Sequence, residues 1–411
     1  MGRTLRIGMY SQFFGATVGG GEKYFGVTAE AIRDAWPQHR LEIVTAVPAD
    51  RHRYERELNL DLSGIELHAT NSRVTWAHRG AASVLSRAPL YRDLLLSGLA
   101  VRFTRQYDLF LPMVYVHPVF SKARCTVMLC QFPYLYRPIR FGPTGLVKRV
   151  YRLPYHALRA AFLGDEIASV DRVICQSGYV ARFIREYWNL EPAVINPPID
   201  VPIREPDWAA KAPIVLAVGR FFRGGHNKRH DLMIQAFREL YDGGLRGWEL
   251  HLAGSVHDQG ISAGYFDYLT EMSRDYPIYL HGNAPYEKLQ DLYCRASIFW
   301  HAAGYGADPA VSPASLEHFG MSTGEAMANG AVPVVIAAGG QLEIVDGGKD
   351  GFLWSTPAEL KALTLRLIER PSLRKSLGAA ARKRSCTFAR ERFKGEMVAQ
   401  LSQFVGKLES S

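Results

Sequence analysis

The stretch Ser297-Ile-Phe-Trp-His301, followed by Glu317-His-Phe-Gly-Met-Ser-Thr-Gly-Glu325, carries the clearest structural signal in the chain. Its first segment is apolar and has the length of a strand, and the run from Ser322 to Asn329 has the composition of a helix. A strand that leads through a loop into a helix is the repeating unit of α/β folds. The free N–H groups of such a helix attract anions, and carboxylates beside them can accept hydroxyl protons.

The same alternation of strands and helices extends over nearly the whole chain. Apolar runs predict strands at Leu5–Tyr10, Leu41–Ala46, Asp108–Leu111, Thr126–Leu129, Arg172–Cys175, Ala193–Asn196, Ile214–Val218, Glu249–Ala253, Ile278–Leu280, Ser297–His301 and Val332–Ile336. Helical periodicity predicts helices at Glu22–Ala35, Ser83–Tyr107, Ser177–Trp188 (capped by Ser177), Arg229–Tyr241, Tyr286–Arg295 and Ser322–Asn329.

A proline-rich segment, Pro197–Pro213, separates two such series and reads as a linker. The expected fold class is therefore α/β, with two doubly wound Rossmann-like domains that face an interdomain cleft. We expect an N-terminal domain over residues 1–198, a linker over 199–213 and a C-terminal domain over 214–386. Residues 387–411 are expected to form a helix that crosses back to the first domain.

Composition favours a globular protein in a reducing compartment. The chain has 411 residues, of which 47% are hydrophobic, and its five cysteines lack the spacing of a metal site. The net charge of +9 is concentrated between residues 67 and 164, where arginines alternate with aromatic residues. This basic region suits an anionic membrane surface, although an ordinary solvated surface explains it equally well. No motif of a nucleic-acid-binding module is present.

Two further loops have the composition of anion-binding sites. The first predicted strand leads into Gly19-Gly20-Gly21-Glu22, a glycine-rich turn before a helix. The strand ending at Val218 leads into a basic loop that runs from Arg220 to Lys228. These two cations can bracket a diphosphate, one with a planar fork and one as a point charge. Without other support, each loop is also compatible with an ordinary connection between a strand and a helix.

Taken together, these motifs resemble the retaining nucleotide-sugar glycosyltransferases of family four, which have the GT-B fold. The resemblance rests on the glycine loop, on Gly219-Arg220 with Lys228-Arg229, and on the E-x7-E spacing of Glu317 and Glu325. Gly339-Gly340-Gln-Leu-Glu343 and Asp350-Gly-Phe352 complete it. The longer Arg220–Lys228 loop resembles a bacterial subgroup that is loosely like the lipid-linked-oligosaccharide mannosyltransferases.

The resemblance implies a role for each matching residue. Glu317 would hold the donor sugar, and Arg220 and Lys228 would neutralise the diphosphate leaving group, so that neither a metal nor another cofactor is needed. Glu325 would bind the ribose. The remaining donor-binding residues would act mostly through their backbone: Gly19, Gly20, Gly21, Gly282, Asn283, Ala284, Phe319, Gly320, Met321 and Ser322.

One departure from the family concerns the reaction side of the N-terminal domain. Many members carry a histidine after a strand there, whereas the matching position in this chain is Gln131. Glutamine can donate and accept hydrogen bonds but cannot titrate. His117 is an alternative on the same side, although a lone histidine is more often structural.

The implied function is metal-independent, retaining transfer of a hexose from a nucleoside-diphosphate sugar to a glycan or lipid-linked acceptor, in cell-envelope or polysaccharide biosynthesis. Its expected location is the cytoplasm, at the inner face of the cell membrane. The alternative is a nucleotide-sugar-binding protein, or another GT-B enzyme such as an epimerase or phosphorylase. The sequence shows neither an obvious pair of proton-transfer groups nor a lysine placed for pyridoxal. It does not identify the base, the sugar or the acceptor.

Overall fold

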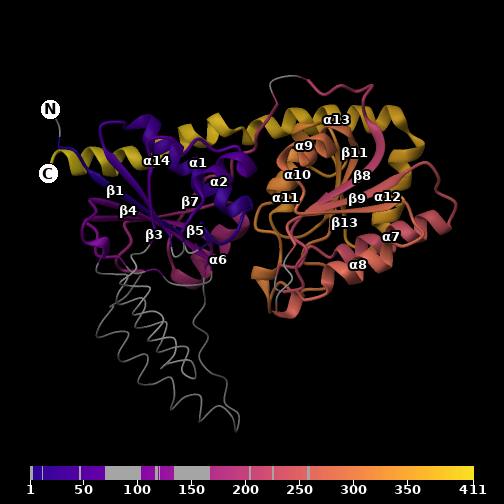
Figure 1. Ribbon diagram of the computed structural model, residues 1–411, viewed down its shortest axis with the longest axis horizontal. Coiled ribbons are helices and arrows are strands. Elements are labelled where there is room, and N and C mark those ends of the chain that lie inside the picture. Colours follow the sequence, from indigo (N-terminus) through magenta and orange to yellow (C-terminus); the bar gives the residue numbers. More distant parts are fainter. Residues whose placement is uncertain are drawn as a thin grey trace, which may run out of the picture. The chain divides into compact units, whose positions relative to one another are not determined.

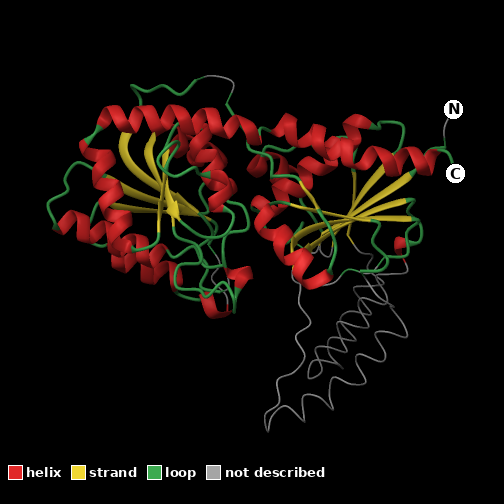
Figure 2. Cartoon of the chain, turned by 180° about the vertical axis from the view of Figure 1, so that it is seen from behind, coloured by secondary structure: helices red, strands yellow, loops and turns green. Residues whose placement is uncertain are grey.

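The computed structural model describes residues 3–11, 13–45, 48–69, 103–115, 119, 121–133, 167–202, 205–224, 226–256 and 260–411. The chain forms two compact units. Unit 1 consists of residues 1–176, 180–195 and 394–411, and unit 2 consists of residues 177–179 and 196–393. Figures 1 and 2 show a parallel sheet flanked by helices in each.

Unit 1 contains a seven-stranded parallel sheet in the order β3-β2-β1-β4-β5-β6-β7. Its strands are β1 (Arg6–Ser11), β2 (Arg40–Thr45), β3 (Glu66–Ala69), β4 (Leu109–Tyr115), β5 (Cys125–Phe132), β6 (Arg172–Cys175) and β7 (Ala193–Val194). The described helices of this unit are α1 (Gly20–Ala35), α2 (Arg51–Leu58) and most of α6 (Gly178–Trp188), together with the end of α14 (Arg390–Glu409). The strand order reverses between β1 and β4, so the loop after β1 lies where such sheets bind ligands.

The C-terminal part of α14 is anchored to unit 1 by charge and by apolar packing. Lys394 Nζ lies 3.0 Å from Glu30 Oε2 and 3.1 Å from Asp34 Oδ2, both on α1. Further along the helix, Met397, Leu401, Val405 and Leu408 are buried. These residues recur every three or four positions, which places them on one face of the helix.

Unit 2 contains a six-stranded parallel sheet in the order β10-β9-β8-β11-β12-β13. Its strands are β8 (Ala212–Val218), β9 (Glu249–Gly254), β10 (Ile278–Gly282), β11 (Ala296–His301), β12 (Val332–Ile336) and β13 (Phe352–Trp354). This is the Rossmann order, and it reverses between the adjacent strands β8 and β11. The loops that follow these two strands therefore meet at the switch point of the sheet.

Helices cover both faces of the unit 2 sheet, which explains why its strands are apolar on both sides. One face packs against α7 (His230–Asp242), α8 (Tyr265–Ser273) and α12 (Pro357–Glu369). The other packs against α9 (Tyr286–Arg295), α10 (Met321–Ala328), α11 (Gln341–Ile344) and α13 (Pro371–Ser385). Along β8, Val215 and Ala217 enter the first core, and Ile214 and Leu216 enter the second. Short 3-10 turns lie at Gly260–Ser262, Pro313–Ser315 and Cys386–Phe388.

The predicted fold class is confirmed: the chain contains two α/β domains built on parallel sheets. The sequence predicts that Ser177 caps α6, and this stays a prediction. The Ser177 Oγ–H group donates to the carbonyl of His318 at 2.5 Å. The N–H groups of Gly178 and Tyr179 donate to the Glu343 carboxylate at 2.9 and 2.6 Å, so a side chain distant in sequence binds the start of the helix.

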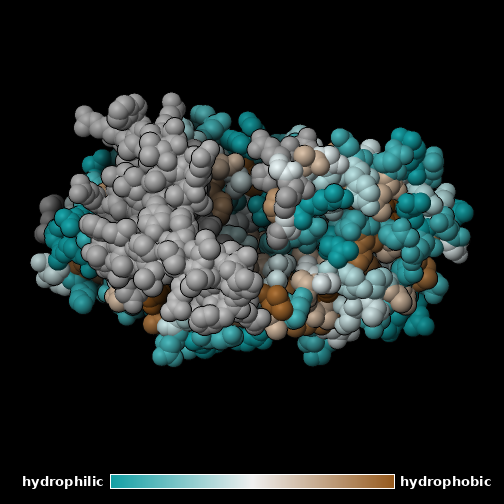
Figure 3. Space-filling model, turned by 90° about the horizontal axis from the view of Figure 1, so that it is seen from below, coloured by the Kyte–Doolittle hydropathy of each residue, from teal (hydrophilic) through white to brown (hydrophobic). Residues whose placement is uncertain are grey.

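Most of the basic region between residues 67 and 164 lies outside the described residues, and so does most of the helix predicted at 83–107. Within the described ranges, none of the helices combines the length and the apolarity that crossing a bilayer requires. On the face shown in Figure 3, hydrophobic residues of the described part form small separate patches among polar ones.

Candidate active site

The predicted donor-side residues meet at the switch point of unit 2. Arg220 and Lys228 lie in the loop after β8, and Glu317 lies in the loop after β11. Because β8 and β11 are hydrogen-bonded neighbours, their carboxyl ends bring these loops together although they are far apart in sequence.

Arg220 and Lys228 differ in their surroundings. Arg220 is exposed, and it forms no ion pair with any residue that the structure describes. Lys228 is largely buried, and its alkyl chain lies directly over Gly219, where a Cβ atom would approach Lys228 Cγ to 2.6 Å. Glycine at position 219 therefore allows the lysine to cross the end of β8.

Glu317 is buried inside a cluster of nitrogen donors. Lys228 Nζ lies 2.5 Å from Glu317 Oε2, and His301 Nε2, at the end of β11, lies 2.8 Å from the same oxygen. His226 Nε2 lies 3.5 Å from the other oxygen, Oε1. The His226 ring stacks on His318, with the ring centres 4.9 Å apart.

The charge of Glu317 is maintained by these neighbours. Burial alone would raise the pKa of Glu317, but the charge of Lys228 and the contacts with His226 and His301 outweigh burial and hold this pKa well below 4.5. Burial lowers the pKa of His226 and of His301, and lowers that of His318 to about 3. At neutral pH the cluster thus contains an ionised carboxylate beside neutral imidazoles.

The N-terminus of α10 forms the next part of the site. Its N-cap, Gly320, has φ 116°, a left-handed conformation that favours glycine. The Phe319 side chain is buried in the core, so this residue can face a ligand only through its backbone. The N–H groups of Met321 and Ser322, in the first helical turn, have no acceptor within the helix, so they are suited to bind an anion.

Glu325 lies on α10 itself, one turn further along. Its Oε2 accepts a hydrogen bond of 3.0 Å from the hydroxyl of Tyr293, on α9. Glu325 and Glu317 therefore have different neighbours, a tyrosine hydroxyl in one case and a basic cluster in the other.

The predicted segment Gly282-Asn283-Ala284 follows β10. Asn283 has φ 53°, and its side-chain oxygen accepts from the N–H of Val256 at 2.9 Å. Its own N–H donates to the carbonyl of Gly254 at 2.8 Å. The side-chain oxygen and the backbone N–H of Asn283 thus both join the end of β10 to the residues at the end of β9.

In unit 1, the structure brings the glycine loop and Gln131 together. Gly19 is the N-cap of α1, and Gly20 and Gly21 begin the helix. The Gln131 amide, at the end of β5, lies so close to Gly21 that a Cβ atom there would approach its Nε2 to 2.4 Å. Gln131 Nε2 also contacts Met113 Sδ at 3.2 Å. His117 lies outside the described residues.

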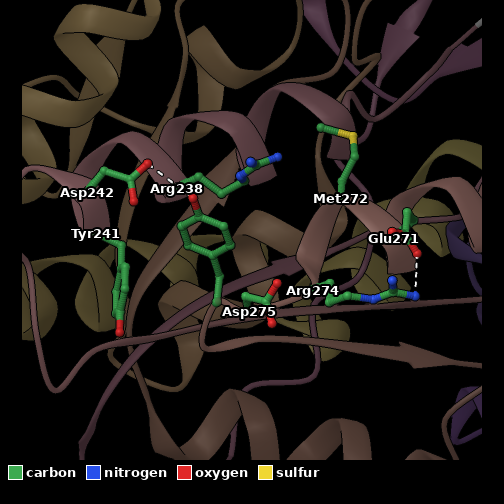
Figure 4. A pocket seen from close by; sticks show the side chains of 8 residues that line it. Arg238, Tyr241, Asp242, Glu271, Met272, Arg274 and Asp275 are labelled. Atoms are coloured by element: carbon green, nitrogen blue, oxygen red, sulfur yellow. Dashed lines mark hydrogen bonds and ion pairs between the residues drawn. The ribbon is translucent and has the colours of Figure 1, made fainter.

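A separate pocket of about 370 Å³ lies elsewhere on unit 2, between the C-terminal ends of α7 and α8 (Figure 4). It is lined by Arg238, Tyr241, Asp242, Glu271, Met272, Arg274, Asp275 and Tyr276. None of these is a predicted site residue. The loops at the carboxyl ends of β8 and β11 therefore remain the better candidate for the chemistry.

Several residues of the site were not included in the sequence-based prediction. His226, His301 and His318 surround Glu317, and Tyr293 binds Glu325. Of these residues, only His301 has a feature in the sequence that points to the site, because it ends a predicted strand at the carboxyl edge of the sheet. Across the parts of the chain that the structure describes, no group of three or more His, Cys, Asp or Glu side chains is arranged to hold a metal ion.

Comparison with known proteins identifies the class. Residues 202–384 match the family model "Glycosyl transferases group 1". The human protein "Alpha-1,3/1,6-mannosyltransferase ALG2" is 25% identical over 320 residues, which cover 71% of this chain and 70% of that protein.

Solved structures share the whole fold at lower identity. Anabaena Alr3699/HepE, in complex with UDP and glucose, superposes with a TM-score of 0.62 at 17% identity, and the match covers 97% of this chain and 100% of that one. Sucrose-phosphate synthase from Thermosynechococcus elongatus gives a TM-score of 0.63 at 17% identity, with coverage of 98% and 100%.

The fold and the C-terminal domain together define a glycosyltransferase of the GT-B fold, as the sequence motifs predict. The chain resembles family four, and its residues 202–384 are similar to the group 1 glycosyltransferases.

Proposed function

We propose that the protein is a retaining hexosyltransferase that takes its sugar from a nucleoside-diphosphate donor bound at the switch point of unit 2. The observation that carries this proposal is the convergence of Lys228, Glu317 and the α10 N-terminus at one edge of the sheet. A carboxylate, a cation and free N–H groups are the donors and acceptors that a sugar diphosphate requires. A hexose is favoured because HepE was solved with glucose and ALG2 is named a mannosyltransferase.

In this proposal the diphosphate lies between Arg220, Lys228 and the first turn of α10. Departure of a nucleoside diphosphate builds negative charge on oxygen, and fixed cations and helix N–H groups stabilise that charge. We propose that these groups suffice without a metal ion. Glu317 binds hydroxyl groups of the sugar, and Glu325, held by Tyr293, binds the ribose. Gly282 to Ala284 line the base.

Retention of the anomeric configuration is part of the proposal. An oxocarbenium-like transition state needs chiefly position and electrostatic field from the protein. We propose a front-face reaction in which the acceptor attacks from the side that the leaving group vacates, with Gln131 on the acceptor side and the glycine loop of unit 1 on the donor side. Gln131 would then orient a hydroxyl group without exchanging a proton with it.

The proposed acceptor is a glycan or a lipid-linked molecule at an anionic membrane surface. The fourteen Lys and Arg between residues 67 and 164, against two acidic residues, would attract such a surface, and the interleaved aromatic residues would enter the interface. Flotation of the protein with phosphatidylglycerol-containing liposomes at low salt, and its release at high salt, would support this. Absence of binding at low salt would refute it.

The donor is tested in two steps. A thermal-shift screen of UDP, GDP and ADP, followed by UDP-glucose and GDP-mannose, identifies the nucleotide and the sugar. Transfer or hydrolysis of that sugar, radiolabelled, then demonstrates the reaction, and NMR of the first-formed anomer gives its stereochemistry. Retained configuration is expected, and an inverted product would contradict the retaining mechanism.

A further inference from the structure

The proposed function gives no role to His301, which belongs to the Glu317 cluster. His301 is the last residue of β11 and is 3% exposed, so no substrate reaches it from solvent without displacing other groups. Its Nε2 lies 2.8 Å from Glu317 Oε2. Lys228 Nζ binds that same oxygen, whereas Oε1 has only the longer contact of 3.5 Å with His226.

This difference assigns separate tasks to the two carboxylate oxygens. Each oxygen has about two acceptor positions. Oε2 uses its positions on Lys228 and His301, so Oε1 is the oxygen that retains capacity for a sugar hydroxyl. His226 lies in the loop after β8 and stacks on His318. Its Nε2 is the nitrogen next to Oε1.

The hydrogen bond from His301 to Glu317 is donated by a neutral imidazole. A neutral imidazole that contacts a carboxylate must place its one N–H group on the contacting nitrogen, which here is Nε2. The other nitrogen, Nδ1, has no hydrogen-bond partner among the described residues, consistent with an unprotonated atom. His301 therefore donates to Glu317 without neutralising it.

The role of this bond follows from competition for Lys228. In the structure Lys228 pairs with Glu317, but a diphosphate arriving at the switch point draws the same ammonium group toward phosphate. A buried carboxylate that loses its partner is strongly destabilised unless another donor remains. His301 is such a donor, because its position on β11 does not depend on the nucleotide.

We propose that His301 is a positioning residue: it holds Glu317 through Oε2 while Lys228 moves to the diphosphate, and so presents Oε1 to the donor sugar. This inference rests on the proposed function of the site. It predicts that His301 affects the sugar-dependent step and not the affinity for the nucleoside diphosphate. The effect on the rate can be large, because a displacement of about 1 Å in a positioned group can lower a rate 100-fold.

The test compares His301→Leu, which removes the donor, with His301→Gln, whose amide nitrogen can replace Nε2. For the sugar nucleotide that the wild type uses, His301→Leu should lower kcat/KM about 10- to 100-fold. The Kd of the matching nucleoside diphosphate, measured by calorimetry, should change less than about threefold. His301→Gln should recover most of the activity. His251→Leu and His251→Gln, at a buried histidine on β9, serve as matched controls and should leave kcat/KM near the wild-type value.

A double variant separates positioning from general stability. If His301 acts through Glu317, then His301→Leu combined with Glu317→Gln should be no slower than Glu317→Gln alone. Additive losses, a parallel loss of nucleoside-diphosphate affinity, or equal activity of His301→Leu and its His251 control would overturn the inference. If His301→Leu does not fold, His301→Asn, whose amide is one bond too short, takes its place. A wild-type protein without transfer or hydrolysis would instead refute the proposed function.

Discussion

At the scale of single residues, Glu317 and Glu325 have distinct surroundings, which predict distinct phenotypes. Glu317 is bound by Lys228 and His301, and Glu325 is bound by Tyr293. Glu317→Ala should lower turnover about 100-fold or more while changing nucleoside-diphosphate affinity little, because the proposed target of Glu317 is the sugar. Glu325→Ala should weaken that affinity about 10-fold or more, because the proposed contact with the ribose is lost. Steady-state kinetics and calorimetry measure both, and equal effects of the two substitutions would contradict the assignment.

Lys211 gives a prediction for pH dependence. Its Nζ donates to the carbonyl of Ala296 at 2.8 Å in a partly buried position, and burial lowers its pKa to about 8. Between pH 8 and the unfolded value near 10.5, the unfolded chain binds a proton that the folded chain has released, so stability rises with pH in that window.

The free energy of unfolding of the wild type, relative to Lys211→Met, should therefore increase by about 1 to 3 kcal/mol from pH 7.5 to pH 10.5. Urea unfolding at both pH values measures this difference. A difference that stays constant or decreases would show that Lys211 keeps an ordinary pKa in the folded protein.

The sequence indicates which residues belong to the candidate site better than it indicates which side chains contact each other there. Arg220, Lys228 and Glu317 could be proposed as site residues because they follow strands at the carboxyl edge of a sheet and match the motifs of the family that the chain resembles. The hydrogen bond from His301 to Glu317 and the contact of His226 with Glu317 could not be derived, since they depend on the register of β11 and on the path of the loop after β8. The path of that loop includes a left-handed residue, His226, with φ 65°.

At the scale of elements, the start of α10 depends on the close approach of two backbones. The N–H of Gly340 donates to the carbonyl of Glu317 at 2.7 Å. A Cβ atom on Gly340 would lie 2.5 Å from the carbonyl oxygen of His318 and from the Cα of Phe319. The loop that carries Glu317 therefore has no room for a side chain at position 340.

Gly340→Ala should accordingly displace this loop, lower the free energy of unfolding by about 1 to 3 kcal/mol and lower kcat/KM at least 10-fold. Gly406→Ala, in helix α14, is the matched control because a Cβ atom there meets nothing within 4 Å. This control should be neutral or stabilise by up to about 1 kcal/mol. Equal melting temperatures and activities for the two variants would contradict the account.

Helices and strands were predicted where their residues are apolar and periodic. They were missed where the only indication was a short motif such as a helix cap. Strands β8 and β11 were predicted to within two residues, because buried parallel strands are continuous apolar runs. Helix α12 was not predicted, although Thr356, Pro357 and Glu359 form a readable capping box. The Glu343 carboxylate, which accepts from the first N–H groups of α6, could not be predicted because it is remote in sequence.

At the scale of the whole molecule, the C-terminal segment should be needed for the stability of unit 1. Residues 394–411 group with that unit, and Leu401 is completely buried. Leu401→Asp should destabilise unit 1 by about 3 kcal/mol or more, because it buries a charge and removes apolar packing. Hydrogen exchange resolved by peptide should show lost protection in β1, β4 and β5. The exposed Gln403→Asp should leave protection unchanged, and equal exchange in both variants would contradict the prediction.

We propose that sugar transfer occurs at the switch point of unit 2, with Arg220 and Lys228 stabilising the leaving diphosphate. The most direct test is the rate of nucleoside-diphosphate release from the preferred sugar nucleotide, measured with EDTA present, for the wild type, Arg220→Ala, Lys228→Ala and the remote control His251→Gln. The wild type and the control should be active, and each cation variant should be slower by about 100-fold or more. Wild-type rates in both cation variants would contradict the claim.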